Sequence, residues 1–309
     1  MNPSPSAPLA RGGGAARGAI FAGVACYTLW GVLPLYLHAV AAAGPAPLEV
    51  IAHRALWSVP WAGLLVLMAG QVRQCAEVLR SPRILGLLVV SALLIALNWT
   101  LYVWAVAHGR LLEGSLGYYI NPLMNMALGA ILFRERLDVV GWGAIALAVI
   151  GVGVQTLALC RPPYISIVLA LTFATYGLIR KQVSAEAQTG LFVECLVLAP
   201  LSLGYILWLE AHGGGHFGAH LQPTILLLLA GPVTVVPLML FAWAARRLPL
   251  STIGFLQFIG PTLQFVIGVE GGESLTTARA VSFGFIWAGV LLFAFGAWRK
   301  TRGLRPAAA

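Results

Sequence analysis

Charged residues are scarce in this chain. Asp, Glu, Lys and Arg together make up 9% of its 309 residues, whereas a soluble domain carries roughly 25%. Apolar residues make up 60% of the chain, so there are too few charges to coat a surface that faces water. The composition therefore excludes an ordinary soluble protein and predicts that lipid covers most of the surface.

Motifs for catalysis, metals and nucleotides are also missing. The sequence contains no GxxxxGK[ST], GxSxG or HExxH pattern, so we expect no ATP-driven pump, no enzyme and no cofactor. The four cysteines stand alone at positions 26, 75, 160 and 195 and have no metal-ligand spacing. His212, His216 and His220 are four residues apart, but Gly213 and its glycine neighbours disfavour a helix there, so no metal site is predicted.

Ten apolar segments are long enough to cross a bilayer, which takes about 20 residues at 1.5 Å per residue. We expect an all-α integral membrane protein with ten transmembrane helices, and polar or proline-containing joints separate its spans. The first span has an alternative interpretation as a signal peptide, but it is too long and contains Pro34. The predicted helices are 18–40, 48–70, 83–107, 113–133, 139–159, 163–180, 190–209, 223–245, 249–269 and 278–298.

The positive charges indicate the orientation. Almost all of the 19 basic residues are arginines near span ends, the arrangement by which membrane proteins follow the positive-inside rule. With the N-terminus inside, fifteen lie on the cytoplasmic side and three, Arg110, Arg161 and Arg279, lie outside. We expect both termini in the cytoplasm of a bacterium, a multi-pass protein of the inner membrane, lipid as its surroundings and no nucleic-acid partner.

The two halves of the chain resemble each other. Trp104 and Trp243 are 139 residues apart, as are Pro122 and Pro261, and both pairs occur in similar local sequences. Because each half holds five predicted helices, the second copy must enter the membrane from the opposite side. Inverted repeats are the usual architecture of alternating-access carriers, although duplication is also a simple way to build ten helices.

This repeat divides the chain into four parts. The first five-helix repeat covers 17–160 and the second covers 161–300. Residues 1–16 are expected to form a disordered N-terminal tail, and residues 301–309 a C-terminal tail.

Short motifs along most of the chain carry a resemblance to a known family. They include LGYYINPL at 116–123, EAQTG at 186–190 and FIGPTL at 258–263. Further matching segments are 52–54, 57–58, 98–99, 104–106 and 176–181. On these residues the chain resembles RarD-type members of the EamA family, within the drug/metabolite transporter superfamily.

The resemblance implies a bundle of two five-helix repeats that exports or exchanges small solutes. Its function is expected to be that of a secondary transporter of metabolites or drugs working by alternating access. The alternative is a non-transporting membrane scaffold or a flippase-type subunit. A small-molecule substrate and a coupling proton are the expected partners, and the oligomeric state does not follow from the sequence.

Ionisable residues inside the membrane are candidates for the transport pathway because burying them is costly. Arg54 and His53 lie within the second span and Glu194 within the seventh, and aligning Pro60 with Pro200 makes Glu194 the counterpart of Arg54. Since neighbouring residues on a helix point about 100° apart, Arg54 and His53 are not expected to face one cavity equally. The alternative for Arg54 is a side chain that extends to the lipid headgroups. The alternative for Glu194 is a carboxylate that accepts hydrogen bonds from nearby helix ends.

Amides and aromatic rings in three further spans complete the candidate pathway. Asn98 and Tyr102 are four residues apart and should share a helix face, and Gln257 and Gln264 should share another. The alternative for each amide is a hydrogen bond that merely joins two helices. The full set is Arg54, His53, Asn98, Trp99, Tyr102, Tyr118, Tyr119, Asn121, Glu194, Gln257 and Gln264, with Pro122 and Pro261 as mid-helix kinks for gating.

Overall fold

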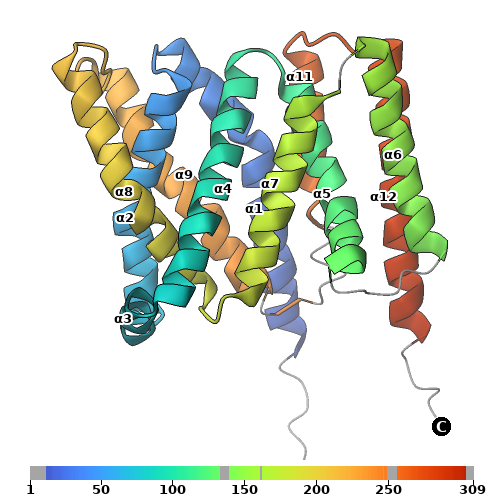
Figure 1. Ribbon diagram of the computed structural model, residues 1–309, viewed down its shortest axis with the longest axis horizontal. Coiled ribbons are helices and arrows are strands. Elements are labelled where there is room, and N and C mark those ends of the chain that lie inside the picture. The colour runs from blue at the N-terminus through green and yellow to red at the C-terminus, as the bar shows by residue number, and fades with distance from the viewer. Residues whose placement is uncertain (1–11, 133–138, 161, 246, 249–255, 304–309) are drawn as a thin grey trace, which may run out of the picture.

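The computed structural model describes residues 12–132, 139–160, 162–245, 247–248 and 256–303 (Figure 1). Every regular element within these ranges is an α-helix. The helices are α1 (Gly12–Ala42), α2 (Pro47–Met68), α3 (Val72–Arg80), α4 (Pro82–Ala107), α5 (Leu111–Leu132), α6 (Val139–Leu159), α7 (Tyr164–Gln182), α8 (Ala187–Ala211), α9 (Leu221–Ala245), α11 (Ile259–Glu270) and α12 (Thr277–Gly303).

Seven helices in the described part of the chain are long and apolar enough to cross a membrane, by length and composition: α1, α2, α4, α6, α8, α9 and α12. The apolar helix Tyr164–Arg180 is shorter. Large apolar side chains such as Phe21, Leu67 and Leu157 are exposed, which suits helices that face lipid rather than water. The described residues thus confirm the expectation of an all-helical membrane protein.

Nine of the predicted spans begin and end within a few residues of a described helix. The ninth differs, because α11 begins only at Ile259, after a turn at Gln257 and Phe258. The part of that predicted span at 249–255 lies outside the described residues. The predictions also missed α3, a short helix with a charged, amphipathic sequence that hydropathy alone does not detect.

Both chain ends of the described bundle lie on the same side. α1 begins and α12 ends at the bottom of Figure 1, and we call this side the termini end. α1 and α12 each extend into a segment that the sequence assigned to a tail, while residues 1–11 and 304–309 lie outside the described part.

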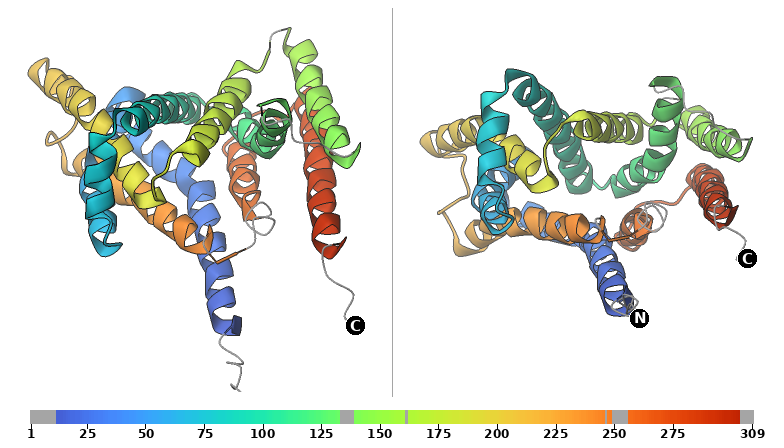
Figure 2. Two further views of the ribbon diagram at one scale, coloured as in Figure 1. Left: turned by 60° about the horizontal axis from the view of Figure 1, so that its bottom comes forward. Right: turned by 90° about the horizontal axis from the view of Figure 1, so that it is seen from below.

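The first helix of each half of the chain packs against two helices of the other half. α1 contacts α9 and α11, while α7 contacts α4 and α5. α2 packs against α8, and α6 packs against α12 at one extremity of the elongated bundle (Figure 2). Small residues permit the closest approaches: a side chain at Gly231 of α9 would collide with the backbone carbonyl of Trp57 in α2.

Candidate functional site

Arg54 lies in the interior of the bundle. It is seven residues from the start of α2 at Pro47, which places it about 10 Å along the helix. Its side chain is only 6% exposed, and its guanidinium lies over the ring of Trp99 on α4, 4.2 Å from the ring centroid. Within the described residues its Nε has no hydrogen-bond partner, and no carboxylate forms an ion pair with it.

Three tyrosines lie near the same guanidinium: Tyr36 on α1, Tyr102 on α4 and Tyr118 on α5. The rings of Tyr102 and Tyr118 pack edge to face with centroids 5.3 Å apart. The hydroxyl of Tyr102 is buried and has no hydrogen-bond partner among the described residues. We refer to Arg54, Trp99, Tyr102 and Tyr118 as the arginine site.

Asn98 holds one wall of the arginine site in place. Its Oδ1 accepts a hydrogen bond from the Tyr118 hydroxyl at 3.3 Å. Its Nδ2 donates to the Leu169 carbonyl at 2.9 Å and to Thr172 Oγ1 at 2.8 Å, both on α7. The predicted common face of Asn98 and Tyr102 is confirmed, since both side chains contact Tyr118. Asn98 joins helices and positions a tyrosine, which is the alternative that the sequence left open for such amides.

His53 points away from the arginine site. Its ring stacks on Phe217, with centroids 4.9 Å apart, and its Nδ1 accepts a hydrogen bond from Trp57 Nε1 at 3.0 Å. An indole N–H can only donate, so the neutral imidazole carries its proton on Nε2. The predicted divergence of His53 from Arg54 is confirmed, because the two side chains contact different helices and loops.

Glu194 has partners within the protein. It is seven residues from the start of α8 at Ala187 and is 3% exposed. Ser91 Oγ donates to its Oε1 at 2.5 Å and the Tyr176 hydroxyl donates to its Oε2 at 3.3 Å. Arg180 Nε lies 3.7 Å from Oε1. The carboxylate is therefore paired and hydrogen-bonded without any ligand.

Sequence reasoning missed the surroundings of this carboxylate. Arg180 lies near the end of α7, and its guanidinium occupies the space that a side chain at Gly190 would fill. Immediately before Gly190, Thr189 Oγ1 donates to Gln71 Oε1 at 2.9 Å, which ties the start of α8 to the segment before α3. Of the sequence motifs quoted above, only EAQTG at 186–190 lies at this contact between the start of α8 and the segment before α3. We call Glu194, Arg180, Ser91 and Tyr176 the glutamate site, which lies toward the termini end.

A chain of aromatic rings connects the two sites. Phe173 on α7 has its ring centroid 6.2 Å from that of Tyr118 and 6.0 Å from that of Tyr176. Tyr118 belongs to the arginine site and Tyr176 to the glutamate site. Ring contacts along α5 and α7 therefore run from a residue of the arginine site to a residue of the glutamate site.

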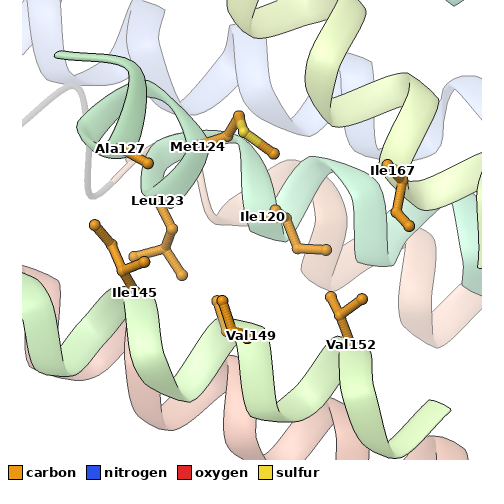
Figure 3. Close-up of a pocket in the computed structure, with 9 residues that line it drawn as sticks. Ile120, Leu123, Met124, Ala127, Ile145, Val149, Val152 and Ile167 are labelled. Atoms are coloured by element: carbon orange, nitrogen blue, oxygen red, sulfur yellow. The ribbon is translucent and has the colours of Figure 1, made fainter. Parts of the chain in front are cut away.

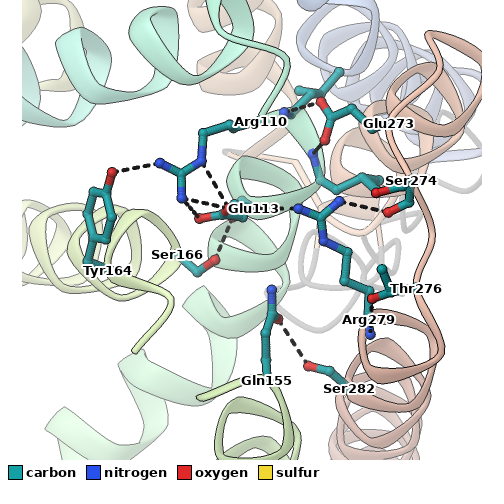
Figure 4. Close-up of polar contacts among 12 residues, drawn as sticks. Arg110, Glu113, Gln155, Tyr164, Ser166, Glu273, Ser274, Thr276, Arg279 and Ser282 are labelled. Atoms are coloured by element: carbon teal, nitrogen blue, oxygen red, sulfur yellow. Dashed lines mark hydrogen bonds and ion pairs between the residues drawn. The ribbon is translucent and has the colours of Figure 1, made fainter. Parts of the chain in front are cut away.

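A second charged cluster lies at the end opposite the termini, where α5 and α12 begin (Figure 1). Figure 4 shows its contacts. Arg110 donates to both carboxylate oxygens of Glu113 at 2.8 Å and to the Tyr164 hydroxyl at 2.6 Å. Arg279, at the start of α12, approaches the same carboxylate at 3.9 Å. These contacts tie α5, α7 and α12 together.

Glu273 extends that cluster. Its carboxylate accepts hydrogen bonds from the backbone N–H groups of Leu111 and Leu112, the first residues of α5, where a helix end attracts negative charge. Burial raises the pKa of Glu273, and these backbone hydrogen bonds oppose that rise. No functional role for this segment was predicted from the sequence.

Glu49 and His216 form a further pair at the same end. Glu49, in the first turn of α2, is 1% exposed. It accepts hydrogen bonds from the backbone N–H of His216 at 2.7 Å and pairs with its Nδ1 at 2.8 Å. This histidine thus anchors a loop to α2, a role that its spacing from His212 and His220 did not suggest.

The remaining predicted residues lie elsewhere in the bundle. The Tyr119 hydroxyl hydrogen-bonds Thr262 Oγ1 at 2.7 Å and so joins α5 to α11. Asn121 and Pro122 are buried in α5, and Asn121 Oδ1 has no partner among the described residues. Tyr119 packs in a different hydrophobic cluster from Trp99, Tyr102 and Tyr118.

Two expectations about the ninth span were wrong. Pro261 was expected in mid-helix, but it is the third residue of α11, where its missing N–H breaks no helical hydrogen bond. Gln257 lies in the turn before α11, so it does not share a continuous helix face with Gln264. Gln264 donates to the Trp30 carbonyl at 3.2 Å and its Oε1 is unpartnered among the described residues.

An apolar cavity of about 290 Å³ lies away from these charges, between α5, α6 and α7 (Figure 3). Side chains such as Leu123, Val149 and Ile167 line it, and none of the lining residues is polar. Its chemistry suits a hydrocarbon chain and differs from that of the arginine site.

Comparisons with known proteins agree on one family. The model of the EamA-like transporter family matches residues 17–157. An "Uncharacterized transporter" of Vibrio cholerae is 39% identical over 294 residues, which cover 94% of this chain and 97% of that protein. "Protein RarD" of Escherichia coli is 39% identical over 283 residues, 91% of this chain and 95% of its own length.

A solved structure shares the fold. It carries the description "Crystal structure of protein", superimposes with a TM-score of 0.57 at 18% identity, and covers 89% of this chain and 97% of its own. At that identity the likeness bears on the arrangement of helices alone.

Proposed function

The chain belongs to the EamA-like transporter family and is a RarD-type protein, and on this premise we propose that it is a secondary transporter of small organic solutes. Membrane transport of the drug/metabolite type follows from its relatives. The finer proposal is export or exchange by alternating access in a bacterial inner membrane, by a carrier that is not an enzyme.

The observation that carries the proposal is the arginine site. Burying an unpaired charge costs several kcal/mol, and a cation–π contact such as that of Arg54 on Trp99 returns only about 2 kcal/mol. An arginine that merely stabilised the bundle would be expected to have a carboxylate partner. Arg54 has none among the described residues, so its charge is available to a solute that enters the membrane interior.

Ten crossings in two inverted five-helix repeats are part of the proposal. The exchanged helix contacts support it, since α1 meets α9 and α11 much as α7 meets α4 and α5. The common side of α1's start and α12's end supports an even number of crossings. The surplus of arginines that the sequence puts on that side supports a cytoplasmic location of both termini under the positive-inside rule.

The charged clusters near the two ends are suited to act as gates. In alternating access, the cluster at one end must separate while the other stays closed. Near the termini end, Arg180 pairs with Glu194, and at the opposite end Arg110 and Arg279 approach Glu113. Protonation of Glu194 would remove the charge that holds Arg180, so Glu194 is our candidate for the coupling-proton site. Pro122, inside α5, is the remaining candidate for a gating kink.

Reconstitution into liposomes tests this function. Labelled amino acids, nucleobase-like metabolites, phenicols and organic acids would be screened with and without a pH gradient. We expect saturable flux of at least one class, loss of that flux in Arg54→Ala and normal flux in Arg247→Ala. The control is matched, because Arg247 also lies over a tryptophan, 4.4 Å from the ring centroid of Trp243, but on the surface.

The alternatives give different results in the same vesicles. Absence of saturable flux for every class, with folded protein, would contradict transport and favour a membrane scaffold. Transbilayer movement of labelled lipid without solute flux would favour a flippase-type subunit.

A further inference from the structure

The carboxylates of the bundle are engaged away from Arg54. Glu49 pairs with His216, Glu113 with Arg110, and Glu194 with Arg180, while Glu273 binds backbone N–H groups. Among the described residues, none of these four approaches the Arg54 guanidinium within ion-pair distance. The counter-charge for this buried cation therefore has to come from outside the described part of the protein.

The geometry of the arginine site limits which kind of anion can neutralise Arg54. Trp99 covers one face of the guanidinium, which leaves the N–H edge for a ligand. A guanidinium edge presents two parallel donors that match the two oxygens of a carboxylate. Arg54 Nε is unpartnered, and the Tyr102 hydroxyl is buried and unpartnered, so donors for one carboxylate are in place.

The charge count favours a monoanion. The arginine site contains a single cation, and the partly exposed Arg180 already lies 3.7 Å from Glu194. A doubly charged phosphate ester would leave one charge without compensation. An amino acid would bring an ammonium group, for which the site offers no free carboxylate.

The rest of the site is aromatic. Tyr102, Tyr118 and Phe173 pack edge to face one against the next, at centroid distances of 5.3 Å and 6.2 Å. Flat apolar groups stack well on such rings, whereas a strongly hydrated solute would lose its water without replacement. The apolar part of a solute can therefore lie along these rings while its carboxylate meets Arg54.

We propose that the arginine site binds an organic monocarboxylate with an aromatic or similarly apolar body, through Arg54 and the Tyr102 hydroxyl. This inference rests on the proposed function, since it names the class of solute that the transporter moves. It assigns Arg54 as the anion-binding residue, Trp99 as the ring that fixes the guanidinium plane, and Asn98 as the residue that positions Tyr118.

A matched set of probes tests the charge. Equilibrium binding to the purified full chain in detergent would be measured at pH 7.5 for 3-phenylpropionate, its neutral amide, the zwitterion phenylalanine and the cation phenethylamine. These molecules share one ring and a similar length. We expect the carboxylate to bind at least about 30-fold more tightly than the amide. This factor is the low end of the affinity loss seen when one partner of a buried, hydrogen-bonded charge pair is removed.

Arg54 variants test the residue. Arg54→Gln should weaken 3-phenylpropionate binding by about 30-fold or more and abolish the preference over the amide. Arg54→Lys should bind at an intermediate level, because lysine keeps the charge but lacks the two-pronged edge. Arg247→Gln is the control, with unchanged affinity. Thermal melting of each variant shows that it is folded.

Three results would overturn the proposal: equal binding of amide and carboxylate, unchanged affinity in a folded Arg54→Gln variant, or no binding of any probe. None of them removes the transport function, which the liposome screen tests separately. Saturable flux of neutral or cationic solutes that survives Arg54→Gln would reject the anion site and keep the transporter. Carboxylate binding without flux of any solute would keep the anion site and reject the transporter.

Discussion

Arg54 and Glu194 occupy corresponding places in the two halves of the chain but have opposite environments. Each lies seven residues into its helix, from Pro47 in α2 and Ala187 in α8, and each is almost fully buried. Glu194 has an arginine, a serine and a tyrosine as partners, while Arg54 lies over Trp99 and has no carboxylate partner among the described residues.

This difference separates two uses of a buried charge. A charge that is neutralised inside the protein holds helices together and can act as a gate when its protonation changes. A charge that lacks an internal partner makes the site depend on a ligand. The two charges thus differ in their partners, although each lies seven residues into its helix.

Removing the unpartnered charge should have the largest functional effect. We expect Arg54→Ala to reduce saturable solute flux by about 100-fold or more, the cost of losing a desolvated charge contact. Because no internal ion pair is broken, the amount of protein in the membrane should stay normal. Quantitative blotting beside the flux assay checks both, and normal flux at normal abundance would remove Arg54 from the pathway.

Removing the partnered charge should instead affect stability. Glu194→Gln leaves the partly buried Arg180 without its carboxylate, so we expect a loss of about 2 kcal/mol in the free energy of unfolding. The double variant Arg180→Gln/Glu194→Gln removes both charges and should regain most of that loss. Unfolding in detergent for the full double-mutant cycle gives the coupling energy, and additive effects would show that the 3.7 Å pair contributes nothing.

Packing at two matched glycines sharpens the comparison further. Gly31 of α1 and Gly177 of α7 each follow an aromatic residue in the first helix of their half of the chain. A Cβ at Gly31 would lie 2.8 Å from Leu263 Cβ on α11, whereas a Cβ at Gly177 would meet nothing within 4 Å. We expect Gly31→Ala to destabilise the protein by about 1–3 kcal/mol through overpacking, and Gly177→Ala to stabilise it by about 0.5 kcal/mol. Equal melting shifts for the two variants would contradict this asymmetry.

Much of the fold was predictable because a bilayer restricts what a chain can do. Spans such as 83–107 and 139–159 match α4 and α6 within one residue, since an apolar run of that length has no other stable environment. The same reasoning is insensitive to features that do not change hydropathy. It missed the short amphipathic helix α3 and the turn at Gln257 and Phe258.

The site was only partly predictable. Arg54 and Glu194 stood out because charge is rare within spans, and the i,i+4 spacing of Asn98 and Tyr102 correctly placed them on one face. Contacts between helices could not be read from one sequence. Nothing near Glu194 marked Arg180 as its partner, and nothing near Glu49 indicated His216, because each pair is set by how helices and loops pack.

The most direct test of the central claim compares the two charged sites in one assay. Counterflow of the solute that the screen identifies would be measured in wild type, Arg54→Gln and Arg180→Gln/Glu194→Gln, with protein-free liposomes as the blank. Counterflow needs binding and alternation but no proton gradient. The account predicts loss of saturable counterflow in Arg54→Gln and its retention in the double variant. Retention in Arg54→Gln with loss in the double variant would contradict it.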